Sequence, residues 1–368
     1  MKIKKLTFVL LSMLSTAGFA GNYNDKGSES SPTNNKEDGS HFYIDVGTNA
    51  YYFNQPAMNL PVSTGAFADG PPYPTAASSS YDVDNWSTNP NVTLGYEFLT
   101  VNETLQKIFG QQNAIELHAN YFHSSGTDTV DYGNNYYVVP WFINGAPDQF
   151  FYLGGSSLLK SSQVIFDNSY TEVGLNYTGS KVINNNLLSA AYIGVDFIKL
   201  KQNSSYTADM YSASDLDYEY LQKSDGSDDL SSYYTGFVFG ETLTRLLSTN
   251  YAIYGKVGAG MYWMHTTLAA TQVPIDNFET ASPYLNETYY ANDSDNKLTF
   301  KTEMEVGINY YFNNNQDLMS PRITVLAGAD YWNNVAYVKN PTCANEPAKI
   351  AYSSTVNPYA GIELHIPF

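Results

Sequence analysis

Apolar and polar residues alternate along most of the chain after residue 40, and the last thirteen residues show the pattern best. One face of this segment carries Pro358, Ala360, Ile362, Leu364, Ile366 and Phe368. The opposite face carries Asn357, Tyr359, Gly361, Glu363 and His365. Successive side chains of a β-strand point to opposite faces, so a period of two predicts a strand with one apolar and one polar side.

Similar alternation marks ten segments. They span residues 41–53, 91–98, 115–121, 171–177, 188–200, 233–246, 251–264, 298–312, 322–332 and 356–368. The connections after the odd-numbered segments are long, and those after the even-numbered segments are brief. An even strand number with long loops at one end is typical of an all-β, antiparallel, up-and-down transmembrane barrel. The count becomes twelve if a hairpin over residues 136–153 joins the wall. The alternative fold is a soluble sandwich with residues 356–368 as an edge strand.

The final strand resembles the closing strand of Gram-negative outer-membrane β-barrels, because its alternation ends on a C-terminal Phe368. The resemblance implies that the apolar face meets lipid and that Phe368 acts as the assembly signal. It also implies periplasmic chaperones, the barrel assembly machinery, outer-membrane lipid and lipopolysaccharide as partners. Pro358 and Pro367 depart from the pattern, since each removes a donor from the hydrogen-bond ladder.

The first twenty residues have the order of a secretory signal peptide. Lys2, Lys4 and Lys5 precede a short apolar run, and small residues end the segment at Ala20. Residues 21–40 are almost free of apolar side chains and predict a flexible polar leader. The barrel is therefore assigned to residues 41–368, in the outer membrane of a bacterium.

Composition agrees with this assignment. The chain has 33 Tyr and 19 Phe among 368 residues, and its mean hydropathy is -0.32. The formal net charge is -18, and removal of the three signal-peptide lysines takes it to about -21. This acidity excludes nucleic acid as a partner and favours cations over anions. The single Cys343 has no partner for an internal disulfide.

Charged residues are predicted to face the lumen. The cluster consists of Lys256, Lys301, Glu303, Glu305, Arg322, Asp330 and Glu363. Further inward positions are Asp45, Glu97, Glu116, His118, Glu172, Asp196 and His365. Two interpretations remain open, a salt-bridge network that fills a narrow barrel and the charged lining of a narrow pore. In the first, charged side chains of adjacent strands meet, and Glu303 or Glu305 balances the charge of Lys301. We predict no cofactor and no metal site.

A long acidic loop is predicted over residues 204–231. It carries Asp209, Asp215, Asp217, Glu219, Asp225, Asp228 and Asp229. These carboxylates either bind divalent cations, bridging to lipopolysaccharide, or form a solvated and mutually repelling surface.

No catalytic residues are predicted. Omptin proteases are also ten-stranded barrels, and they use paired Asp residues that face a His-Asp pair. Asp82 and Asp84 can supply the first pair, but the residue two before His265 is Trp263 and not an acid. A lipase would need an inward Ser beside a His, and no such pairing stands out in the sequence. We therefore expect the protein not to be an enzyme.

A narrower resemblance lies in three short, aromatic-rich motifs. They are residues 43–53, residues 81–86 and residues 91–98. Together they are similar to the start of the Legionella-type major outer membrane protein family, whose members are pore-forming surface proteins. The resemblance implies a porin-like passive pore or a surface-exposed barrel that meets small solutes, cations or a host surface. The alternative is a non-conducting adhesin or structural barrel that acts through its extracellular loops.

Overall fold

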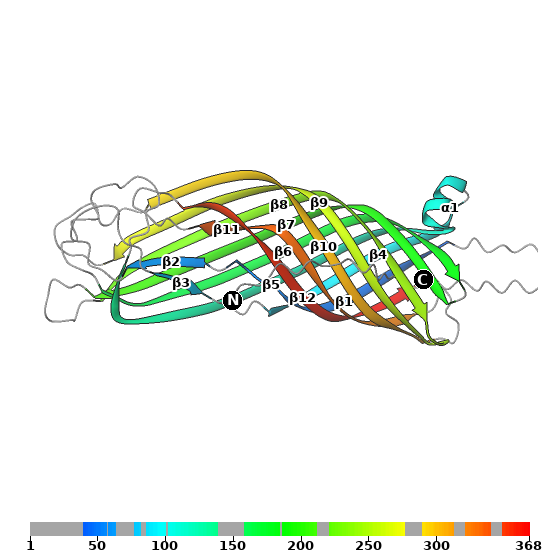
Figure 1. Cartoon of the computed structure of the whole chain (residues 1–368), viewed down its shortest axis with the longest axis horizontal. Helices are drawn as coiled ribbons and strands as arrows, with labels where there is room; N and C mark the ends of the chain where they lie inside the picture. The colour runs from blue at the N-terminus through cyan, green and yellow to red at the C-terminus, as the bar shows by residue number, and fades with distance from the viewer. Residues whose placement is uncertain are drawn as a thin grey trace, which may run out of the picture.

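The computed structural model describes residues 40–56, 58–63, 77–81, 86–100, 102–138, 158–184, 186–211, 221–276, 289–312, 321–339 and 348–368. Nearly all of these residues lie in antiparallel strands (Figure 1). The elements are β1 (His41–Tyr52), β2 (Met58–Ser63), β3 (Ala77–Tyr81), β4 (Trp86–Leu99), α1 (Glu103–Phe109), β5 (Gln112–Val138), β6 (Leu158–Asn184), β7 (Leu187–Tyr211), β8 (Leu221–Leu246), β9 (Tyr251–Asp276), β10 (Tyr289–Tyr311), β11 (Arg322–Lys339) and β12 (Lys349–Pro367).

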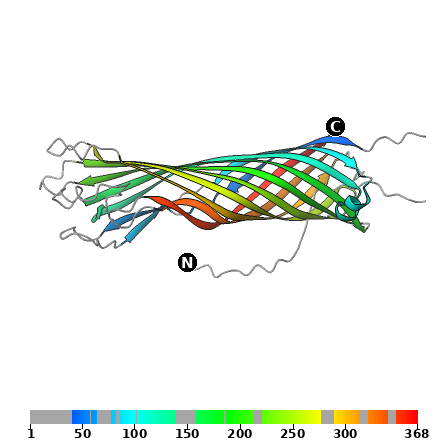
Figure 2. The same cartoon turned by 90° about the horizontal axis from the view of Figure 1, so that it is seen from above.

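Ten strands close into a ring, which confirms the predicted barrel. Each of β4 to β12 pairs with its neighbour in the chain, and β1 pairs with both β4 and β12. At the closure Asp45 lies opposite His365 on one side and opposite Thr93 on the other. The closed wall twists around a long axis in both views (Figure 2). Closure leaves no exposed strand edge in the ring, as a lipid environment requires.

The start of β1 and the end of β12 both lie at the end of the barrel that has the short connections. The amide of Phe368 donates to the carbonyl of Phe42 at 2.8 Å, and the amide of Phe42 donates back at 3.2 Å. The connection between β4 and β5 contains α1, a single short helix. Its N-terminal amides are capped by the side chain of Asn102, and Gly110 ends it at φ 90°, a value that L side chains rarely adopt. In the described part of the chain, no helix has the length and apolar character to cross a bilayer.

The outer surface carries an apolar band between two girdles of exposed aromatic residues. The lower girdle, on the side of the short connections, contains Phe42, Tyr96, Tyr251 and Tyr310. The upper girdle, on the opposite side of the band, contains Trp86, Tyr121, Tyr233, Trp263 and Tyr331. Ten residues separate Trp86 from Tyr96 on β4. At about 3.4 Å per residue and a tilt of about 45°, this span is about 24 Å along the membrane normal. A closed barrel with such a band spans a bacterial outer membrane.

The strands continue past the upper girdle, where the two faces of the wall exchange character. On β8, Phe237 and Phe239 face outward below the girdle, whereas Asp225 and Asp229 are the exposed residues above it. The interior above the girdle contains an apolar cluster instead. It consists of Leu230, Leu268, Ala270, Ala291, Ala336 and Ala348. The part of the barrel beyond the girdle, called the extension below, is therefore polar outside, whereas its interior combines apolar clusters with buried polar side chains such as Asp228 and Ser232.

The extension corrects the predicted loops. The long connection predicted between segments 115–121 and 171–177 contains strand at both ends, because β5 runs to Val138 and β6 begins at Leu158. Residues 204–231 likewise belong mainly to β7 and β8, and residues 265–296 to β9 and β10. The connection between the first two predicted segments contains the hairpin β2–β3, which pairs with the end of β5. This hairpin brings the described sheet to twelve strands. Most of the predicted hairpin over residues 136–153 lies outside the described residues.

Candidate functional site

The lumen within the membrane band encloses a polar cavity of about 300 Å³. Eight carboxylates line it: Asp45, Glu116, Glu172, Asp196, Glu303, Glu305, Asp330 and Glu363. Only three basic side chains, Lys256, Lys301 and Arg322, lie among the residues that line the cavity. With the carboxylates ionised and His118 neutral, the wall has five uncompensated negative charges. The cavity therefore favours cations or protons.

The structure places all seven residues of the predicted lumen cluster on the wall of this cavity. Lys256 Nζ lies 2.9 Å from Glu303 Oε1, and Tyr254 donates to Glu305 at 2.9 Å. Tyr359 donates to both Glu303 and Glu305, at 3.1 and 3.0 Å. These contacts join β9, β10 and β12 across the inner surface of the barrel, so the charges there are held by partners.

The prediction that Glu303 or Glu305 balances Lys301 was wrong. Its Nζ lies 3.3 Å from Oε1 of Glu172, which belongs to β6 on the far side of the lumen. The neighbouring position Glu303 is instead held by Lys256. Lys301 also lies over the rings of Trp332, at 5.2 Å from the centroid, and Tyr170, at 6.0 Å. The lysine therefore crosses the lumen between two groups of aromatic rings.

A second set of buried charges lies at the end with short turns. His365 Nδ1 lies 2.6 Å from Asp45 Oδ1, and Arg322 Nη2 lies 4.0 Å from the same oxygen. His41 Nε2 lies 3.1 Å from Glu97 Oε2 nearby. Asp45, Glu97, Arg322 and His365 were predicted to face inward. The contact of Asp45 with His365 follows from the closure between β1 and β12, and that of His41 with Glu97 follows from the pairing of β1 with β4.

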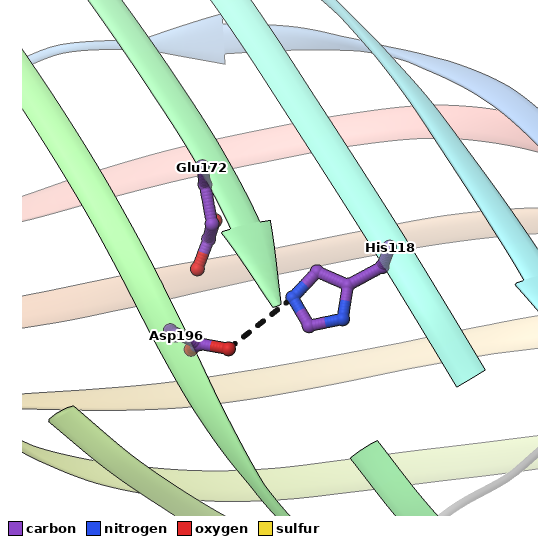
Figure 3. Close-up of side chains that lie close together, drawn as sticks. All are labelled: His118, Glu172 and Asp196. Atoms are coloured by element: carbon purple, nitrogen blue, oxygen red, sulfur yellow. Dashed lines mark ion pairs between the residues drawn. The ribbon is translucent and has the colours of Figure 1, made fainter. Parts of the chain in front are cut away.

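Three neighbouring strands bring together a group of residues that we did not predict as a site. His118 of β5, Glu172 of β6 and Asp196 of β7 each offer one metal-ligand atom, and these atoms lie within 4.8 Å of one another. Figure 3 shows the three side chains converging, with Nε2 of His118 3.4 Å from Oδ1 of Asp196. All three were predicted to face inward, but the alternation alone does not give the register that brings them together. The one hint in the sequence was the glycine two residues after Glu172. A glycine at an inward position leaves space for side chains of the neighbouring strands, as Gly174 does for His118 and Asp196.

Aromatic rings fill the lumen at the outer side of the cavity. This aromatic layer consists of Tyr51, Phe53, Phe122, Tyr170, Tyr234, Tyr262, Trp332 and Tyr359, each at most 9% exposed. Phe122 contacts Tyr51, Phe53 and Tyr170, with ring centroids 5.0, 5.6 and 5.2 Å apart.

On the facing side of the lumen, Trp332 contacts Tyr234 and Tyr262, with ring centroids 5.1 and 6.0 Å apart. Tyr234, Tyr262 and Trp332 each adjoin an outward residue of the upper girdle in sequence. The aromatic layer is therefore level with that girdle.

The acidic residues between β7 and β8 do not form one loop. Asp209, Asp225, Asp228 and Asp229 lie on the strands, and Asp215, Asp217 and Glu219 fall outside the described residues. Asp229 is exposed and lies 3.4 Å from Lys201 Nζ. Asp228 instead points into the extension, where Ser204 donates to it at 3.3 Å. Its burial raises the pKa of the carboxyl from 3.8 to about 7.

The remaining predicted features meet the structure only in part. His265 is exposed and its Nδ1 lies 2.9 Å from Asn296 Oδ1. Asp82, Asp84, Cys343, the signal peptide and the leader up to residue 39 lie outside the described residues. The absence of catalysis, the assembly role of Phe368 and the expected partners stay predictions.

No family model and no curated protein matches the chain. Among solved structures, the outer membrane protease OmpT of Escherichia coli is 10% identical, with coverage of 89% of this chain and 97% of OmpT and a TM-score of 0.41. The monoaromatic hydrocarbon channel CymD is 9% identical, with coverage of 89% and 88% and a TM-score of 0.31. The outer membrane channel DcaP of Acinetobacter baumannii is 9% identical, with coverage of 89% and 97% and a TM-score of 0.22. These similarities are too distant to bear on function, and the Legionella-type resemblance stays a prediction.

Proposed function

We propose that the protein is a surface-exposed outer-membrane barrel whose lumen is closed to ions and solutes, and that it acts through the extension. The observation that carries this proposal is the aromatic layer. Its members come from β1, β5, β6, β8, β9, β11 and β12 and from Phe53 just after β1, so rings enter the lumen from most of the wall. Lys301 lies between the two groups of rings and reaches Glu172.

A passive pore would need a continuous wet path through this level. Ten strands enclose a lumen only slightly wider than that of an eight-stranded barrel, which side chains fill. The polar cavity does not supply such a path by itself, because buried rings cover its outer side. Beyond them the interior of the extension is packed, with Leu230 and Leu268 at most 2% exposed.

The extension offers a broad outer surface in place of a pore. Its exposed residues include Asp225, Ser227 and Asp229, and Ser227 bonds to the partly exposed Thr271, so this wall is acidic and rich in hydroxyl groups. Such a surface suits contacts with lipopolysaccharide sugars, with divalent cations or with a host surface, as expected from the charge of the chain.

The test is single-channel recording on the refolded mature protein in planar bilayers. We expect no steps of conductance from the unmodified protein. Trp332→Ala and Phe122→Ala together remove one ring from each group of the layer and should produce stable conductance steps. The matched control is Trp263→Ala, which removes a 60% exposed ring from the outer face and should leave the barrel silent. The pore would be supported instead if the unmodified protein conducts and if charge reversal of Lys301 or Arg322 switches the preference between cations and anions.

A further inference from the structure

Two carboxylates and a histidine of the cavity wall meet where β5, β6 and β7 lie side by side. Asp196 is 4% exposed, and its Oδ2 accepts a hydrogen bond from Tyr262 at 2.9 Å. Its Oδ1 is buried and accepts no hydrogen bond, although it lies 3.4 Å from Nε2 of His118. Burial without a hydrogen bond is costly for a carboxylate oxygen, and His118 at 3.4 Å is too distant to donate a strong one.

The separation of these two atoms fits a shared metal ion. Zinc binds His nitrogen and carboxylate oxygen at about 2.0–2.2 Å, which puts two ligands of a tetrahedral ion about 3.4 Å apart. The distance between His118 Nε2 and Asp196 Oδ1 is 3.4 Å. A carboxylate oxygen of Glu172 completes a group of three within 4.8 Å (Figure 3).

Gly174 is required for this arrangement. It lies between the two ligands in the register, paired with His118 on one side and with Asp196 on the other. A Cβ at this position would overlap Asp196 Oδ1 and the His118 ring. The glycine therefore leaves open the space above β6 in which the two side chains converge.

Nδ1 of His118 lies beside the side chain of Asn176, which can serve as its partner whether or not a metal ion is bound. Asn176 Nδ2 lies 3.3 Å from His118 Nδ1, and Asn176 Oδ1 is buried without a hydrogen bond. A half-turn of the amide group exchanges the two atoms with little change of shape. Oδ1 can then accept the Nδ1 proton, which leaves the Nε2 lone pair free for a metal. Metal-binding histidines usually donate their other nitrogen to such an acceptor.

Glu172 keeps capacity for one more bond. Its Oε2 accepts from Tyr170 at 2.7 Å and from Asn120 at 3.0 Å, and its Oε1 lies 3.3 Å from Lys301. A carboxylate has about four lone-pair positions, so one remains on Oε1. The hydrogen bonds fix the orientation of the carboxylate, and Lys301 balances its charge.

We propose that the lumen binds one divalent metal ion of the zinc type, through His118 Nε2, Asp196 Oδ1 and Glu172. One nitrogen and two oxygens favour a borderline first-row ion over calcium or magnesium, which prefer all-oxygen sites. Three protein ligands leave one position for water from the cavity. The ion ties three adjacent strands together and satisfies the buried oxygen of Asp196.

The experiment uses the untagged mature barrel, stripped with EDTA and titrated with Zn²⁺ against a chromophoric chelator. We expect one ion per chain, and the Co²⁺ form should show the strong visible absorption of a four-coordinate site. His118→Gln and Asp196→Asn should each weaken Zn²⁺ affinity at least tenfold. Asn176→Leu retains the ligands and removes the partner of Nδ1, so about a ten- to hundredfold loss is expected.

The matched control is His123→Gln on the same strand. His123 also lies near a carboxylate, at 3.6 Å from Asp167, but both side chains are about half exposed on the outside. Its substitution should leave the affinity unchanged, and gel mobility before and after boiling should show that every variant is folded. A dissociation constant weaker than about 100 µM for the unmodified protein would overturn the proposal. Equal affinity of the unmodified protein and His118→Gln would do the same.

Discussion

Replacing Lys301 by Met should destabilise the barrel strongly, because the change leaves Glu172 charged and buried without its cation. The side chains of Lys301 and Glu172 are 13% and 6% exposed, so water compensates little for the loss. Removing one partner of a buried ion pair costs about 3–5 kcal/mol. Met fills most of the space of the lysine stem, so the effect reports mainly the charge and the contact with Trp332.

The double variant Lys301→Met with Glu172→Gln should recover much of this loss. The carboxamide oxygen that Glu172→Gln introduces can still accept hydrogen bonds from Tyr170 and Asn120, and no charge is left without a partner. We expect a coupling energy of about 2–3 kcal/mol between the two positions. Combining Lys301→Met with Glu303→Gln is the control, because Glu303 belongs to Lys256 and its loss opens a second defect.

The assay is urea unfolding of these variants and the unmodified protein in the same lipid vesicles, with EDTA present to keep the lumen free of metal. Additivity of the Lys301 and Glu172 changes within about 0.5 kcal/mol would show that each group is solvated alone. In that case the lumen at this level is wet, and the closed barrel of the proposed function loses its support.

Two further predictions concern the extension. Because the pKa of Asp228 is about 7 when folded and 3.8 otherwise, its contribution to stability is lost as pH rises from about 4 to about 7. Asp228→Asn should therefore raise the unfolding free energy at pH 8 by up to about 4 kcal/mol and have little effect at pH 4, and an equal gain at both pH values would contradict this. A peptide tag inserted between Tyr211 and Leu221 should bind antibody on intact cells, and labelling only after permeabilisation would reverse the topology. Gly226 is unsuitable for the tag, because it lies in β8 and a Cβ there would overlap the Tyr206 ring.

The ten wall strands could be predicted because the membrane band gives the sequence a simple rule. Within the band, lipid selects apolar residues on one face and the lumen admits polar residues on the other. The outward positions of the closing strand, from Pro358 to Phe368, are all exposed as predicted. The rule ends at the upper girdle, where Asp229 faces water and Asp228 faces the interior. With polar residues on both faces, strand and loop give the same pattern.

The partners inside the lumen could not be predicted for a different reason. Alternation shows which side chains point inward, but the ring must close before opposite walls are known. Lys301 and Glu172 are 129 residues apart and lie on strands that are not neighbours. His118 and Asp196 also lie on strands that do not pair, and they meet only because Gly174 leaves the space between them open.

The exchange of faces at the upper girdle fixes how deep the barrel sits in the membrane. If the barrel sank toward the periplasm by two residues, about 6.8 Å along each strand, polar residues just above the upper girdle, such as Ser231 and His123, would enter the hydrocarbon. Moving outward would expose the apolar band to water, so both shifts are opposed. Twelve residues separate Tyr233 from Leu221 on β8, about 29 Å along the normal at a tilt of about 45°. The extension is thus a spacer of set length, whose outer end stands at a constant height above the lipid.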